Sequence, residues 1–224
     1  MNIPAFKQLY NMWILKGPRT ADGFPGQAGL MTISAYIVNN FYQPYRSSDF
    51  HIIILSGERS FFAKIEQPSS PGGKPILNIH RELFLMSPAF LISAIGHEMV
   101  HAIQFEQQID VDLKGIYGAH RAFLELEASE WESWNKDFDW KIGFNDVYDC
   151  LLELEKESSQ KTLECRRWQV RYAIETAAFN PVNLNKLEKW LKANPWTRDV
   201  WLPKNPNWKS FEAGARPDGD CEPF

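Results

Sequence analysis

Cysteine is scarce in this 224-residue chain, which contains Cys150, Cys165 and Cys221 and has no CxxC pair. The absence of paired cysteines excludes a cysteine-based zinc knuckle. It is typical of proteins from a reducing compartment, where we expect these residues to be inert buried thiols. One disulfide with a remaining free thiol is the alternative that the composition allows.

Long hydrophobic runs and an excess of basic residues are also missing. No apolar run approaches the ~20 residues that span a bilayer, so we expect no integral membrane segment. Twenty-four basic and 28 acidic side chains give a net charge of −4, which argues against nucleic acid as a partner. The N-terminus lacks a basic stretch followed by an uninterrupted apolar one. We therefore predict a protein that is cytoplasmic as synthesised, with export by a non-classical secretion system left open.

The composition that is present fits a globular domain. Hydrophobic residues make up 44% and charged residues 23%, close to the averages for soluble proteins. No repeat, low-complexity tract or linker divides the chain, so we predict a single domain over residues 1–224. Its expected parts are N-terminal helices and sheet (1–87), two helices that carry the site (88–136), and a helical part with an irregular tail (137–224).

Hydrophobic periodicity predicts an α+β fold, in which a small mixed sheet packs on one buried helix and the C-terminal half is mostly helical. Residues 30–42 fit a helix, although their β-branched content leaves a strand possible. The SGERS segment, 56–60, is expected to be a hairpin-like connection between two strands. The other predicted helices cover 4–16, 88–108, 119–136, 145–158, 164–178 and 183–193, and the predicted strands cover 50–56, 61–66 and 75–83.

The stretch HEMVH, from His97 to His101, is an HExxH pattern and the most specific chemical signal in the sequence. It lies in the apolar run 88–108, for which Ser87 is the expected N-cap. Residues four apart on a helix differ by about 40° in azimuth, so both imidazoles can grip one cation from a single face. Glu98 lies about 100° round from His97, close enough to act on a water at that cation. We therefore predict a metal site, against the alternative of a surface helix with two incidental histidines.

A tetrahedral zinc site with an open position needs a third protein ligand. Gln104 and Gln107 stand where a longer motif would have a glycine and a third histidine, which excludes the three-histidine version. A glutamate from the next helix is the expected substitute, and Glu125, Glu127 and Glu130 compete for the role. Small residues share the helix face of Glu125, whereas bulky ones surround Glu127. We predict Glu125 as the ligand, with Glu127 as the alternative.

The HExxH motif, followed on a later helix by ELEAS (125–129), resembles the gluzincin branch of the zincin metallopeptidases. That branch pairs HExxH with a downstream ExxxD, whose Glu is the third zinc ligand and whose Asp supports a zinc histidine. Ser129 stands where the family usually has Asp, so either another residue supports the histidine or the motif aligns on Glu127. The resemblance implies the zinc ligands His97, His101 and Glu125 and the general base Glu98.

The resemblance implies a zinc-dependent metallopeptidase that hydrolyses peptide bonds through a zinc-bound water activated by Glu98. Its cofactor is then Zn²⁺ and its partner a peptide or protein substrate. The stretch HEMVHAIQ (97–104) is also similar to the HExxHxxQ of zincin-like domains in bacterial injection systems. An effector or toxin role of that kind implies an immunity or inhibitor protein as a further partner. Two alternatives stay open: a catalytically silent zincin-fold interaction module, and a zinc amidase acting on a cell-wall linkage.

Two further parts of the site are expected, one from the resemblance and one from the hydrolytic mechanism. In the zincin fold, the strand just before the metal helix is a sheet edge that captures the substrate backbone by β-augmentation. Residues of the strand 75–83 are in that place, and they include Ile76, Asn78 and His80. A donor for the tetrahedral oxyanion is also expected. Its unranked candidates are Tyr117, His120, Arg121 and Tyr148.

Overall fold

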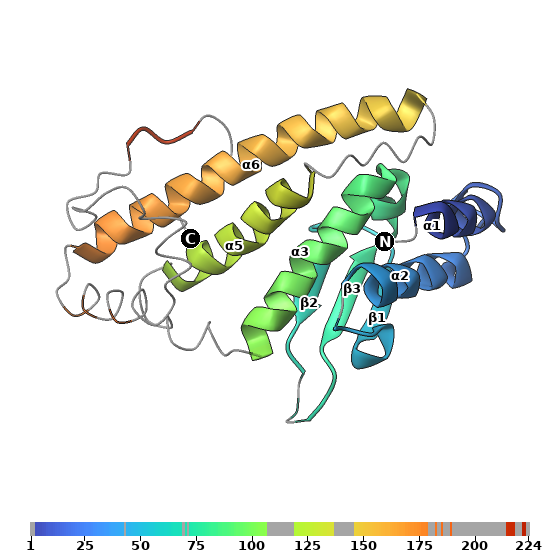
Figure 1. The fold of residues 1–224 in the computed structure, drawn as a ribbon, viewed down its shortest axis with the longest axis horizontal. Helices are drawn as coiled ribbons and strands as arrows, with labels where there is room; N and C mark the ends of the chain where they lie inside the picture. The colour runs from blue at the N-terminus through green and yellow to red at the C-terminus, as the bar shows by residue number, and fades with distance from the viewer. Residues whose placement is uncertain are drawn as a thin grey trace. The chain divides into compact units, whose positions relative to one another are not determined.

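A computed structural model describes residues 3–42, 44–68, 70, 72–106, 119–136, 146–178, 182, 185, 189, 214–217 and 221–222 (Figure 1). The chain forms two compact units, of which the first comprises 1–102 and 134–156, and the second 103–133 and 157–224. The described part contains five α-helices and a three-stranded sheet, so the predicted α+β class is confirmed. Two compact units can belong to one domain or to two, so the single domain over residues 1–224 stays a prediction.

Two helices open the first unit. Helix α1 (Ile3–Tyr10) continues into a π-helical turn (Asn11–Leu15), which confirms the first predicted helix. Helix α2 (Gln27–Phe41) resolves the ambiguity between helix and strand in favour of a helix. Ile33 and Ile37 are buried one turn apart on α2, as the apolar stripe of a helix that packs on a core requires.

Strand β3 (Ile76–His80) is the central strand of the sheet, between β1 (His51–Leu55) and β2 (Ala63–Glu66) (Figure 1). It pairs in parallel with β1 and antiparallel with β2, so the sheet is mixed, as predicted. The predicted hairpin at 56–60 is wrong, because β3 lies between the two strands that this segment joins.

The prediction that Ile76, Asn78 and His80 form a substrate-binding edge is also wrong. Both sides of β3 are already paired, with β1 and with β2, so its backbone groups have no open side for a peptide. His80 is instead a structural residue, only 2% exposed. Its Nδ1 accepts a hydrogen bond from the Glu82 N–H at 3.3 Å, and its Nε2 lies 3.2 Å from the Gly57 carbonyl oxygen.

Helix α3 (Pro88–Glu106) carries the HExxH motif and begins at the predicted cap. The Ser87 hydroxyl accepts a hydrogen bond from the Phe90 N–H at 3.1 Å. Glu155, on helix α6 (Asp146–Ala178), accepts hydrogen bonds from both the hydroxyl and the N–H of Ser87, the latter at 2.9 Å. This buried carboxylate fixes the first turn of α3, and so the axis of the helix that presents the histidines.

Contacts near β2 and α2 hold the first turns of this helix, which belongs to the first unit as far as Ala102. The Phe90 ring lies edge-on to the Phe62 ring just before β2, with 5.5 Å between the centroids. The Tyr42 hydroxyl, at the end of α2, donates a hydrogen bond to the Ile92 carbonyl. Residues 91–96 are all buried, so the helix enters the HExxH motif from a water-excluded core.

Helix α5 (Ala119–Lys136) has the predicted bounds, and its residues up to Ser133 belong to the second unit, as does α6 from Glu157 onwards. The prediction of two separate helices at 145–158 and 164–178 is wrong, because α6 runs without a break from Asp146 to Ala178. The residues expected to break it, 159–163, include no Gly or Pro, and the Thr162 hydroxyl donates to the Ser158 carbonyl at 3.0 Å along the helix. The predicted helix at 183–193 lies mostly outside the described residues. No helix in the described ranges combines the length and the apolar character needed to cross a membrane.

A disulfide joins Cys165 of α6 to Cys221, which are 56 positions apart in the chain and have 5.5 Å between their Cα atoms. The expectation of free thiols is therefore wrong for these two residues, and the alternative of one disulfide is confirmed. The side chain of Cys150 lies outside the described part.

Candidate metal centre

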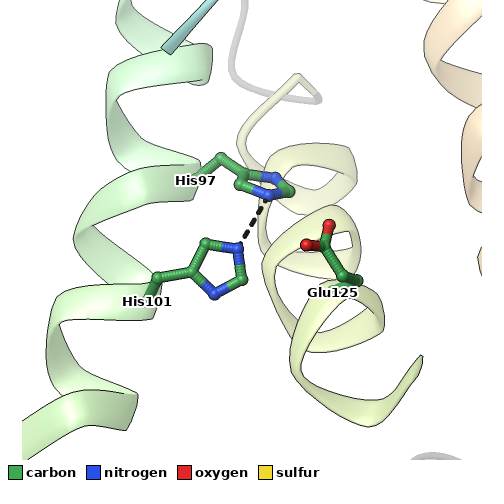
Figure 2. A group of neighbouring side chains, drawn as sticks. All are labelled: His97, His101 and Glu125. Carbon is green, nitrogen blue, oxygen red and sulfur yellow. Dashed lines mark hydrogen bonds between the residues drawn. The ribbon is translucent and has the colours of Figure 1, made fainter. Parts of the chain in front are cut away.

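His97 and His101 face each other across one turn of α3 (Figure 2). Their Nε2 atoms are 3.1 Å apart, and their ring planes meet at 74°. Two nitrogens that bind one tetrahedral zinc at about 2.0 Å lie about 3.3 Å from each other. The pair therefore already has the spacing of two ligands of one cation, as the i, i+4 pattern predicts.

Glu125 of α5 joins this pair in a group of three potential ligands. One ligand atom from each of His97, His101 and Glu125 lies within 4.8 Å of the other two, and within the described ranges this is the one such group of His, Cys, Asp and Glu. Figure 2 shows the carboxylate of Glu125 directed towards the imidazoles. Two imidazoles and one carboxylate are a donor set that suits zinc.

The small residues that favour Glu125 in the sequence are buried in the structure. Ala122, Ala128 and Ser129 are exposed by only 1%, 0% and 4%, respectively. The Ser129 hydroxyl makes no hydrogen bond with any described residue. It therefore does not take the supporting role that Asp has at this place in the gluzincin motif.

Glu127, the alternative ligand, has a different partner. Its Oε2 accepts a hydrogen bond from Gln104 Nε2 at 2.7 Å, and the same amide nitrogen donates to the Leu124 carbonyl at 3.1 Å. Gln104 is completely buried, one turn after His101 on α3. Gln104, which the sequence offers as the last residue of HExxHxxQ and in place of the motif glycine, thus connects the last turn of α3 to α5 through Glu127.

Burial raises the pKa of the Glu127 carboxyl above its usual 4.5, and the hydrogen bond from Gln104 opposes the shift. As the pH rises above 4.5, the unfolded chain loses this proton before the folded chain does, so the free energy of unfolding falls. Glu127→Gln keeps an acceptor for Gln104 and removes the titration. We expect it to raise the free energy of unfolding relative to the wild type at pH 7, and the difference to disappear below about pH 4.

Urea unfolding with a chelator present measures this difference without interference from a metal. Glu157→Gln is the control of opposite sign, because the hydrogen bond from Lys161 lowers the pKa of this fully exposed carboxyl. If Glu127→Gln raised the free energy of unfolding equally at low and neutral pH, the gain would come from packing and not from the titration of Glu127.

Glu98, the residue after the first histidine, is 8% exposed and anchored to the sheet. Its Oε2 accepts a hydrogen bond from the Ile65 N–H of β2 at 2.7 Å. A buried carboxylate that is held by one oxygen has a defined orientation, which a base that must meet one proton requires. Nothing in the spacing of the motif predicts this contact with β2.

The two arginines in the middle of α6 are further residues that the motif does not reveal. Arg166 Nη2 lies 3.3 Å from Glu125 Oε2, and Arg167 Nη2 lies 2.7 Å from Glu130 Oε1. The Arg-Arg pair next to a cysteine was their only signal in the sequence, and it does not identify their partners.

The candidates for the oxyanion donor stay predictions. Arg121 is exposed on α5. Tyr117 lies outside the described residues, and so do the side chains of His120 and Tyr148.

Comparisons with protein-family models, curated proteins and solved structures give no match to this chain. The resemblance to zincins therefore depends on the HExxH motif and the glutamate of the following helix.

Proposed function

We propose that this protein is a zinc-dependent metallopeptidase of the zincin type. The observation that carries the proposal is the group of His97, His101 and Glu125, with one ligand atom of each within 4.8 Å of the others. Glu98, beside the first histidine, supplies a general base for metal-assisted hydrolysis. The mixed sheet next to the HExxH helix is consistent with a zincin-like fold.

Zinc suits the donor set because imidazole nitrogens and a carboxylate oxygen are its common ligands in hydrolases. When bound, zinc lowers the pKa of a coordinated water and polarises a substrate carbonyl. His97 and His101 would hold it through Nε2, and Glu125 through a carboxylate oxygen. Three protein ligands leave a fourth position for water and substrate, which distinguishes a catalytic site from a closed structural one.

Glu98 is proposed to carry the proton. Its carboxylate takes a proton from the attacking water and later gives it to the leaving amine. The hydrogen bond from the Ile65 N–H to Oε2 holds the side chain in place, so Oε1 is the oxygen we assign to proton transfer. The buried surroundings limit competing water and strengthen the electrostatics of this step.

We assign the substrate-binding edge to β2 instead of β3. The His80 N–H donates to the Phe62 carbonyl at 2.8 Å, so residues 62, 64 and 66 form hydrogen-bonded pairs with β3. The backbone groups of Ala63 and Ile65 consequently point away from β3. Because the Ile65 N–H donates to Glu98 on that side, an extended peptide would pair with β2 through the backbone groups of Ala63 and the Ile65 carbonyl, beside the proposed base.

The test is a substrate panel read by mass spectrometry. Zinc-loaded protein is incubated with denatured proteins, peptides and peptidoglycan fragments, with and without 1,10-phenanthroline. We expect new amino termini in the polypeptides, their loss with the chelator and their return when zinc is added. Cleavage of peptidoglycan fragments alone would replace the proposal with a cell-wall amidase, and no cleavage by zinc-loaded protein would indicate a silent zincin-fold module.

A further inference from the structure

The proposed ligand Glu125 has a cationic partner within its own unit. Arg166 Nη2 lies 3.3 Å from Glu125 Oε2, and the two side chains are only 24% and 20% exposed. A carboxylate has two oxygens, so an arginine that holds Oε2 directs Oε1 to another partner. Carboxylates that bind metals are commonly oriented by such a hydrogen-bonding neighbour.

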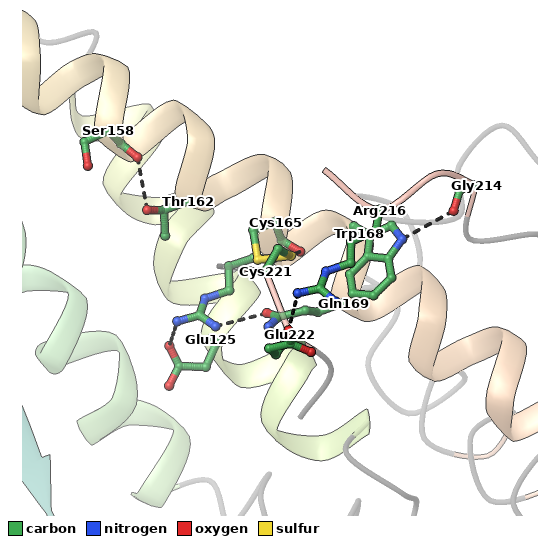
Figure 3. Close-up of a disulfide and its surroundings, with 11 residues drawn as sticks. Glu125, Ser158, Thr162, Cys165, Trp168, Gln169, Gly214, Arg216, Cys221 and Glu222 are labelled. Atoms are coloured by element: carbon green, nitrogen blue, oxygen red, sulfur yellow. Dashed lines mark hydrogen bonds and ion pairs between the residues drawn. A yellow bond between two sulfur atoms is a disulfide. The ribbon is translucent and has the colours of Figure 1, made fainter. Parts of the chain in front are cut away.

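Arg166 is itself held by a side chain one turn further along α6. Its Nη1 donates to Gln169 Oε1 at 3.0 Å. Gln169 is 5% exposed, and its Nε2 donates to the backbone carbonyl of Glu222 at 2.5 Å (Figure 3). Both ends of one amide are thus used to connect Arg166 to the C-terminal segment.

The disulfide fixes that segment on α6. Cys221, which precedes Glu222, is bonded to Cys165, which precedes Arg166 (Figure 3). The Trp168 indole N–H also donates to the Gly214 carbonyl at 3.4 Å. A covalent bond therefore keeps the Glu222 carbonyl within reach of Gln169, so the series runs from the disulfide through Gln169 and Arg166 to Glu125.

We infer that Arg166 is a positioning residue for the metal ligand Glu125, and that the disulfide-bonded C-terminal segment holds Arg166 in place through Gln169. This inference rests on the proposed function, because it concerns the third ligand of the same site. Two effects of Arg166 on metal binding oppose each other. Its charge repels a cation, but its hydrogen bonds restrict a flexible carboxylate to one orientation and lower the entropy lost on coordination. Screening weakens the repulsion at a partly exposed position, so orientation is the larger effect and Arg166 strengthens binding.

The experiment measures metal affinity rather than activity. Metal-free protein is titrated with Co²⁺, whose visible absorption reports ligand geometry, and zinc affinity is measured by competition with a chromophoric chelator. We expect Arg166→Met to weaken zinc binding by about 10–100-fold and to change the cobalt spectrum. Arg166→Lys keeps the charge and should restore part of both.

Arg167→Met is the matched control, because Arg167 is the adjacent residue of α6 and pairs with Glu130 of the same helix α5. It should leave metal affinity and the cobalt spectrum unchanged. Gln169→Leu and the double substitution Cys165→Ser with Cys221→Ser leave Arg166 in place but remove its support. Each should weaken zinc binding by less than Arg166→Met does. If Arg166→Met does not fold, these variants still test whether the contacts from the disulfide through Gln169 position Arg166.

Affinity that is unchanged or tighter in Arg166→Met would overturn the inference, as would an equal loss in Arg167→Met. If Arg166→Met does not fold, unchanged affinity in both Arg166→Lys and Gln169→Leu would overturn it. These results leave the proposed function intact, since the wild type still binds the cation. Failure of the wild type to bind Co²⁺ or Zn²⁺ would contradict the proposed function and this inference together.

Discussion

Replacing Glu98 with Gln is expected to abolish peptide hydrolysis while zinc stays bound. Gln cannot accept the proton of the attacking water, and loss of a general base typically lowers the rate by about 10²–10⁴-fold. The amide has nearly the same shape, and its oxygen can still accept the hydrogen bond from the Ile65 N–H, so the local structure should persist. The rate of peptide cleavage and the zinc content of the same preparation are the two measurements.

Glu106→Gln is a suitable control for this experiment, because Glu106 is an exposed glutamate at the end of the same helix. It should retain both the wild-type rate and the wild-type zinc content. Activity that survives Glu98→Gln would remove Glu98 from the role of base. A loss of zinc in Glu98→Gln would instead assign this carboxylate a role in metal binding.

Glu125→Ala is expected to lose zinc, whereas Glu127→Ala is expected to keep it. Glu125 supplies one of three protein ligands, so its removal should lower affinity by more than the roughly 10–100-fold typical for a neighbour that only orients a ligand. Glu127 is occupied by Gln104 at 2.7 Å, and its loss should mainly affect stability. Zinc per chain, measured by elemental analysis after dialysis, distinguishes the two variants.

A second form of this experiment separates metal loss from unfolding. Glu125→Ala leaves the Arg166 guanidinium without the carboxylate that neutralises it, so the double variant with Arg166→Met removes both charges. It should fold and should still lack zinc. The reverse result, zinc lost from Glu127→Ala and retained in Glu125→Ala, would move the third ligand to Glu127.

Local sequence patterns predict the helices and strands of this fold better than they predict which strands pair in the sheet. The apolar stripe of α2, the Ser87 cap of α3 and the bounds of α5 depend on residues close in sequence, so periodicity and capping rules find them. The strand order does not depend on residues close in sequence, because β3 follows β1 and β2 in the chain but lies between them in the sheet. The pattern therefore favours an edge strand at 76–80, although the edges of the sheet are β1 and β2.

The same distinction holds within the candidate metal centre. His97 and His101 are four residues apart on one helix, so helical geometry alone predicts that they share a face. The preference for Glu125 over Glu127 used the size of same-helix neighbours, which is also local information. Arg166 meets Glu125 from 41 positions further along the chain, and no pattern near either residue signals that pairing.

The disulfide illustrates what composition cannot decide. Three cysteines that are far apart are compatible with free thiols or with one bond, and only the placement of Cys221 beside Cys165 distinguishes them. The polar contacts around Arg166 likewise require the C-terminal segment to be in place. Tertiary structure brings such supporting residues to a site from distant parts of the chain, so local sequence patterns do not predict them.

X-ray absorption at the zinc edge of the loaded wild-type protein tests the central claim most directly. We expect one zinc per chain with two imidazole nitrogens and the remaining ligands oxygen, at about 2.0–2.2 Å. Sulfur at about 2.3 Å, or a shell with no imidazole scattering, would contradict a centre built from His97, His101 and Glu125.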